Sequence, residues 1–150
     1  MKRLICIVLI LVTMFCSAYA DSTSFMISYN SFASIYGAPE ITKTMLKEET
    51  KQKICFENGT MQIIFATINS TEINSVIVAD NDSADFLPAC VCAAMCLHPS
   101  TKDTLQSLGN ILYSYLSVKS GEKSSFGFFG GLYFNMDIVD GKYRFAIGDV

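Results

Sequence analysis

The chain has 150 residues, of which 11 are basic and 14 acidic, giving a formal net charge of −3 at neutral pH. This length fits a single domain, and a hydrophobic content of 51% is ample for a core, which argues against intrinsic disorder. Lys and Arg are neither in excess nor clustered, so we expect neither nucleic acid nor an anionic membrane surface as a partner.

The first 20 residues have the three parts of a cleavable secretory signal peptide. A basic start, Met1-Lys2-Arg3, is followed by an apolar run over residues 4–15 and by the small-x-small motif Ala18-Tyr19-Ala20. The run is shorter than the roughly 20 residues that a membrane anchor needs. Phe15, which precedes Cys16, argues against a lipoprotein, because lipidation sites have a small residue there.

We therefore predict cleavage between Ala20 and Asp21. The product is expected to be a secreted or periplasmic protein without stable membrane insertion. Residues 21–150 are expected to form one α+β domain.

The first element expected after the cleavage site is a helix over residues 24–36. Its apolar residues recur at spacings of one, three and four, and they are Phe25, Met26, Tyr29, Phe32, Ala33 and Tyr36. Ser22, Thr23 or Ser24 can cap its start, and Gly37 with Pro39 ends it. Residues 40–51 are polar and charged and are interpreted as a solvated connector.

A β-hairpin and a third strand follow. Asn58-Gly59, a pair suited to a type I′ turn, separates strand-like runs at residues 53–57 and 60–66. In that register Phe56 opposes Met61, and Ile54 opposes Ile63. A strand over residues 75–79 comes after the polar turn 69–72.

Two helices are expected next. The polar cluster at residues 80–83 precedes a helix over residues 86–97 that is apolar nearly all round and stops at His98-Pro99. The second helix follows a capping pattern of Ser100 with Asp103. We expect its apolar face to cover the core with Leu105, Leu108, Ile111, Leu112, Tyr115 and Leu116, while Lys102, Gln106, Asn110, Ser114 and Ser117 form its polar face.

The last segment predicts a second hairpin that turns at Asp140-Gly141. Counting outward, the apolar pairs are Ile138 with Tyr143, Met136 with Phe145, and Phe134 with Ile147. The run at residues 126–131, rich in glycine and aromatic residues, is interpreted as a bent or bulged strand start buried against helices; the alternative is a ligand groove or partner surface.

The resulting order, α-β-β-β-α-α-β-β, predicts an α+β fold in which helices pack on one face of a five-stranded antiparallel sheet.

Four cysteines follow the predicted cleavage site. A bridge from Cys55 to Cys96 or Cys92 joins a strand to the helix over residues 86–97, and buried free thiols are the alternative. The pattern Cys90-x-Cys92-x3-Cys96-x-His98 has zinc-binding atom types, but on a continuous helix these side chains cannot converge. We therefore expect neither a metal nor a cofactor.

No motif for catalysis stands out. His98 is the only histidine in the chain, so any Ser-His or Cys-His system must use it. Asp80, Asp82 and Asp85 miss the EF-hand pattern and are better explained by helix capping. Glycosylation sequons occur at Asn58, Asn69 and Asn81, and their use depends on the host.

The sequence thus favours a small secreted or periplasmic binding or interaction domain that is not catalytic. Its partner is an unidentified protein or small molecule, and a homo-oligomer is compatible with this interpretation. The alternative is a small exported enzyme that uses scattered carboxylates or an arrangement of Cys90, Cys92 and His98.

Overall fold

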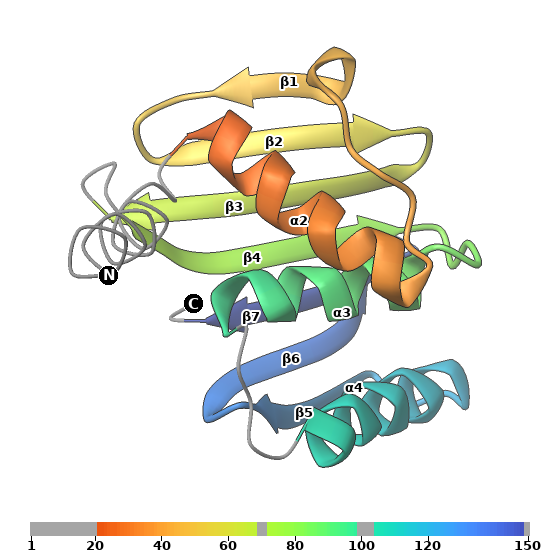
Figure 1. The fold of residues 1–150 in the computed structure, drawn as a ribbon. Helices are drawn as coiled ribbons and strands as arrows, with labels where there is room; N and C mark the ends of the chain where they lie inside the picture. Colours follow the sequence, from red (N-terminus) through yellow and green to blue (C-terminus); the bar gives the residue numbers. More distant parts are fainter. Residues whose placement is uncertain (1–20, 69–71, 99–103, 149–150) are drawn as a thin grey trace, which may run out of the picture.

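The computed structural model describes residues 21–68, 72–98 and 104–148, and within these ranges it contains three α-helices and one seven-stranded antiparallel sheet (Figure 1). The helices are α2 (Ser22–Tyr36), α3 (Phe86–Leu97) and α4 (Thr104–Lys119), and a 3₁₀ turn spans Lys43–Met45. The strands are β1 (Leu46–Glu49), β2 (Lys53–Asn58), β3 (Met61–Ile68), β4 (Glu72–Asp80), β5 (Ser124–Phe129), β6 (Leu132–Val139) and β7 (Lys142–Gly148).

The predicted α+β class is confirmed, whereas the predicted number of strands is wrong. Several sequence predictions lie outside the described residues: the signal peptide up to Ala20, the sequon at Asn69, and the capping pattern of Ser100 with Asp103. None of the described helices combines the length and the apolar character needed to cross a membrane.

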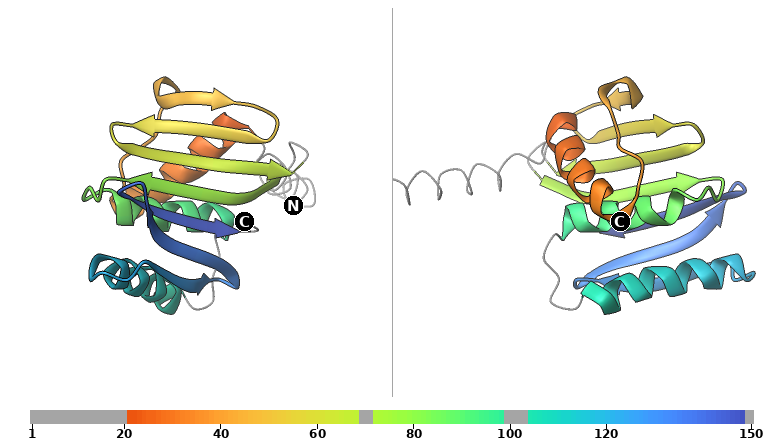
Figure 2. Two further views of the ribbon diagram at one scale, coloured as in Figure 1. Left: turned by 180° about the vertical axis from the view of Figure 1, so that it is seen from behind. Right: turned by 45° about the vertical axis from the view of Figure 1, so that its right-hand side comes forward.

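The sheet joins two meanders in the order β1-β2-β3-β4-β7-β6-β5. All neighbouring strands are antiparallel, and β4 pairs with β7 at the centre. The helices lie on one side of the sheet, so the view from behind shows the strands in front of them (Figure 2). Within the part of the chain that the structure describes, helices cover one face of the sheet, and the other, which carries no helix, is called the open face.

Both strands that the sequence pattern missed lie at the edges of the sheet. Strand β1 falls in the segment predicted as a connector, because a four-residue edge strand with Lys47, Glu48 and Glu49 has too few apolar residues to resemble a strand. Its Glu48 carboxylate accepts a hydrogen bond from the Lys53 ammonium of β2 at 2.6 Å. Strand β5 falls in the segment predicted as a bent strand start; it is a separate strand that turns into β6 through Gly130-Gly131.

The second predicted hairpin is confirmed residue by residue. Ile138 pairs with Tyr143, Met136 with Phe145, and Phe134 with Ile147. Asp140 and Gly141 have φ angles of 52° and 77°, the two left-handed residues that a type I′ turn requires.

The register predicted for the first hairpin is wrong by two residues. Phe56 pairs with Ile63 rather than Met61, and Ile54 pairs with Phe65. The turn consists of Gly59 and Thr60, and Gly59 is left-handed with a φ of 62°. Thr60 at this position donates a hydrogen bond to the Asp80 carboxylate at the end of β4. Because side chains alternate with a period of two, this shift leaves the apolar residues on the predicted face.

Helix α2 closes over the first meander through an aromatic cluster. Phe25 stacks on Phe65 of β3 with ring centroids 4.1 Å apart, and it also contacts Phe56 of β2. All three rings are buried. Asp21, rather than the predicted serine or threonine, caps the helix by accepting a hydrogen bond from the Ser24 amide at 2.7 Å.

Helix α4 packs on the sheet with a face that the sequence pattern did not predict. Ser107, Ser114 and Ser117 are buried, whereas Leu105, Leu112 and Leu116 are 87%, 46% and 52% exposed. The reason is the polar character of the β5 edge, which α4 matches with hydrogen bonds. Asn110 Nδ2 donates to the Phe128 carbonyl at 2.9 Å, Ser125 Oγ donates to Ser114 Oγ at 3.1 Å, and the Gly130 amide donates to Ser107 Oγ at 3.3 Å.

Candidate functional site

The four described cysteines lie on two sides of the sheet. Cys55 alternates along β2 with Ile54 and Phe56, which belong to the core, so its side chain points to the open face. Cys90, Cys92 and Cys96 lie on α3, on the covered face, and are part of the core. The predicted bridge from Cys55 to Cys96 or Cys92 is not formed in the described structure, because it would have to cross the sheet; all four thiols are free and buried.

The thiols of α3 are poorly suited to nucleophilic chemistry. Burial raises the pKa of Cys92 and the pKa of Cys96 to about 12, and it raises the pKa of Cys90 well above the usual thiol value. A thiol must ionise to act as a nucleophile or a metal ligand, and these remain protonated at neutral pH. The described ranges contain no group of three or more His, Cys, Asp or Glu side chains that could hold a metal ion.

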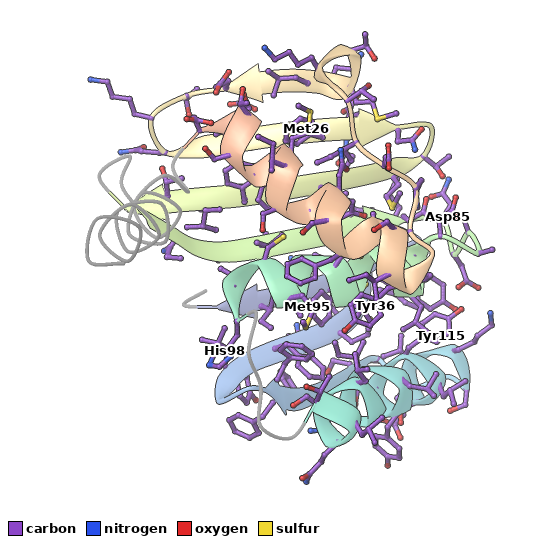
Figure 3. The ribbon with its side chains drawn as sticks, viewed as in Figure 1. Met26, Tyr36, Asp85, Met95, His98 and Tyr115 are labelled. Carbon is purple, nitrogen blue, oxygen red and sulfur yellow. The ribbon has the colours of Figure 1, made fainter. Side chains whose placement is uncertain are left out.

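His98 and the carboxylates near α3 do not converge either. Figure 3 shows Asp85 and His98 at opposite ends of this helix. His98 occupies the C-cap position, where its amide donates to the Ala94 carbonyl at 3.0 Å. Cys90 and Cys92 are fully buried, whereas His98 is half-buried at the end of the helix.

Asp80 is a fully buried carboxylate with a structural role. It accepts hydrogen bonds from the Thr60 hydroxyl and from both the amide and the hydroxyl of Ser83. Burial acts to raise the pKa of Asp80, but the hydrogen bonds from Ser83 and Thr60 outweigh it and hold the pKa below the usual range. Asp80 thus fastens the β2–β3 turn to the segment that leads into α3.

Asp82 connects the same segment to α4. It accepts a hydrogen bond from the Tyr115 hydroxyl and one from the Lys119 ammonium, the latter at 2.9 Å. The Lys119 ammonium also lies 5.2 Å from the centre of the ring of Tyr115, a residue seen in Figure 3. These contacts bind α4 to the loop before α3, and the carboxylates of Asp80 and Asp82 are both engaged in hydrogen bonds.

The strongest candidate for a binding site is an exposed aromatic cluster on the β5–β6 hairpin. Its members are Phe126, Phe128 and Tyr133, which are 56%, 56% and 49% exposed. Tyr133 stacks on Phe126 with centroids 5.8 Å apart, and it meets Phe128 edge-on at 5.2 Å. Ring pairs at these separations attract one another, so the three rings hold a fixed arrangement without being buried.

The aromatic cluster forms one wall of a shallow groove, and α4 forms the other. The groove encloses about 320 Å³ and is lined by Asn110, Tyr113, Ser114, Phe126, Gly127, Phe128 and Tyr133. None of these described lining residues is charged. Of the aromatic residues in the run at residues 126–131, Phe126 and Phe128 line this groove, whereas Phe129 is fully buried.

Gly127 of the groove pairs with Phe134 across β5 and β6. A Cβ atom at Gly127 would lie 2.5 Å from Cζ of the buried Phe134 ring. The ring thus occupies the space that a side chain at position 127 would need. The alternation of residues along β5 could not reveal this contact. Glycine has no side chain that would mark a face of the strand, and the ring that fills the space belongs to β6.

Replacing Gly127 with valine is expected to destabilise the domain by about 1–3 kcal/mol, because the buried Phe134 ring must move. The control is Gly109→Ala on α4, where an added Cβ meets nothing within 4 Å and a gain of about 0.5–1 kcal/mol is expected. Urea unfolding at low protein concentration measures both changes. A Gly127→Val protein as stable as the native one would contradict this packing.

Comparison of the chain with family models, curated proteins and solved structures gave no significant match.

Proposed function

We propose that this protein is a small exported binding domain without catalysis of its own, and that it binds an uncharged apolar segment of a partner protein in the groove between α4 and β5. The observation that carries the proposal is the exposed aromatic cluster of Phe126, Phe128 and Tyr133. Three neighbouring exposed rings are costly to leave in water, and aromatic residues are the usual anchors of protein interfaces.

The chemistry of the lining sets the character of the ligand. Because no charge lines the groove, a charged ligand would lose hydration without gaining a counter-ion. The polar groups that remain, such as the hydroxyl of Tyr113 and the amide of Asn110, can orient a backbone. An uncharged segment with aromatic or aliphatic side chains fits this lining best.

The size of the groove favours a protein segment over an enclosed small molecule. Its volume of about 320 Å³ is at the low end of the range for ligand pockets. Such a groove can take one or two anchoring side chains while the rest of the partner lies outside it. Rings that already contact one another lose little conformational entropy when the partner binds.

The export part of the proposal rests on the signal peptide pattern. Cleavage after Ala20 would keep Asp21, the N-cap of α2, in the product. The mass of the native protein is expected to correspond to a chain that begins at Asp21. A mature product that retains Met1 would contradict export without affecting the groove.

Selection from a library of displayed peptides tests the groove. The native protein is expected to enrich peptides with uncharged aromatic and aliphatic residues, and Phe128→Ser and Tyr133→Ser are expected to weaken their binding by at least about tenfold, as loss of an interface anchor does. Ile35→Ser on α2, which removes an exposed apolar side chain elsewhere, is the control and should bind normally. Enrichment of charged peptides, or equal binding by all four proteins, would contradict the proposal.

A further inference from the structure

The outward side of α4 carries an apolar stripe that points away from the sheet. Ile111 and Val118, which are buried, mark the side of the helix that faces the core. At 100° per residue the stripe lies roughly opposite to them. We call this the leucine stripe; it consists of Leu105, Gly109, Leu112 and Leu116, all of which are exposed.

The leucine stripe lies on a helix that is almost free of charge. From Thr104 to Val118 the helix has no charged residue, and Lys119 at its end is bound to Asp82. A solvated helix face normally carries charged side chains, so this composition suits contact with another uncharged apolar surface. A second copy of α4 would present such a surface, and the pairing would bring no like charges together along the stripe.

The spacing of the leucine stripe is the same when read from either end of the helix. The intervals are four, three and four residues, so the stripe has a midpoint between Gly109 and Leu112. When two such helices run antiparallel about a two-fold axis at that midpoint, Leu105 of each copy faces Leu116 of the other, and Leu112 faces Gly109. A Cβ atom at Gly109 would meet nothing within 4 Å, so the space over this glycine is open to a neighbour.

We propose that the protein forms a two-fold symmetric dimer in which α4 pairs antiparallel with α4 of a second copy, and Leu112 of each copy fills the space over Gly109 of the other. Of the groove residues on α4, Asn110 and Ser114 lie on other sides of the helix from the stripe, whereas Tyr113 lies beside it. One helix face is smaller than the roughly 800 Å² that each partner buries in a typical stable complex. The dimer is therefore expected to dissociate in the micromolar range.

Sedimentation equilibrium between about 1 μM and about 1 mM tests the dimer, since the mass should rise from that of one chain to that of two across this range. Leu112→Lys is expected to weaken association by at least about tenfold, because it places an unpaired ammonium in the contact. The control is Ile35→Lys, which replaces an exposed apolar residue on α2 and should dimerise normally. A native protein that stays monomeric up to 1 mM would overturn the proposal.

Replacement of Gly109 by leucine separates the proposed contact from unspecific association of apolar surfaces. The added side chain enlarges the apolar surface, so it would strengthen unspecific association. In the proposed dimer it occupies the space that Leu112 of the second copy needs, and the dissociation constant should rise by at least about tenfold. The open surroundings of Gly109 leave the fold of the single chain unaffected. Stronger association would overturn the proposed pairing.

Disulfide trapping tests the direction of the two helices. In the antiparallel pair Leu105 of one copy faces Leu116 of the other, whereas the two Leu105 positions are about 16 Å apart along the axis. Mixing Leu105→Cys with Leu116→Cys under mild oxidation should therefore give crosslinked heterodimers, and neither variant alone should crosslink efficiently. The described native cysteines are buried and do not compete. Efficient crosslinking of each variant with itself would indicate parallel helices and overturn the proposal.

Discussion

Replacing Phe65 with alanine is expected to lower the free energy of unfolding by about 3–5 kcal/mol, the largest effect of any single substitution considered for this domain. Phe65 is fully buried beneath α2, with its ring centroid 4.1 Å from that of Phe25 and 6.4 Å from that of Phe56. Removal of the Phe65 ring leaves a cavity between Phe25 of α2 and Phe56 of β2. These two rings belong to different elements and cannot both move to fill it. Equilibrium unfolding in urea measures the change.

Phe128→Ala provides a matched control for this measurement. It removes the same atoms from a ring that is more than half exposed, and a change within about 0.5 kcal/mol is expected. Because a loss of 5 kcal/mol could unfold a marginally stable domain, Phe65→Leu supplies a milder variant that should remain folded and lose about 1.5 kcal/mol. If Phe65→Ala and Phe128→Ala were equally stable, the buried rings of Phe25, Phe56 and Phe65 would not form the core.

Replacing Asp80 with alanine is expected to destabilise the domain by about 3 kcal/mol, because Thr60 and Ser83 lose a charged acceptor in a buried place. Asp80→Asn keeps one acceptor oxygen and should lose less. The two variants compared in urea at neutral pH separate the loss of hydrogen bonds from the loss of the negative charge. A larger loss for Asp80→Asn than for Asp80→Ala would contradict this role.

The same carboxylate makes stability depend on pH. The folded-state pKa of Asp80 is lowered, so its charged form stabilises the fold fully above the unfolded pKa of about 4. That contribution is lost as the pH falls from there through the folded-state pKa. The native protein should therefore lose stability below about pH 4 more steeply than Asp80→Asn. Asp82 contributes with the same sign and remains in both proteins.

The two predicted hairpins show what a local sequence pattern can specify. At Asp140-Gly141 both residues adopt left-handed φ angles, and the pairing follows as predicted. At Asn58-Gly59 only the glycine is left-handed, because the turn moves by one residue and places Thr60 beside Asp80. Thr60 thus contacts a residue that is distant in sequence, and no local rule includes such a contact.

The other errors also arise from contacts between distant segments. The serines of α4 look like a solvent face, yet Ser107 and Ser114 bond to the Gly130 amide and to the Ser125 hydroxyl. Only the location of the β5 edge explains why the leucines point outward. The sequence singled out Phe126 and Phe128 but neither Tyr113 nor Tyr133 of the groove. It also could not separate buried Phe129 from exposed Phe126 and Phe128 before the strand itself was located.

The central position of β7 has a consequence for the order of folding. This strand, Lys142–Gly148, is the last of the described strands in sequence, yet it lies between β4 and β6. Strand β4 of the first meander cannot pair with its neighbour β7 until residues up to 148 have left the ribosome. Pairing that spans the sequence between Asp80 and Lys142 also carries a high contact order, so folding on the millisecond to second scale is expected. The two halves of the sheet therefore join late, because their central pair forms only after β7 has been synthesised.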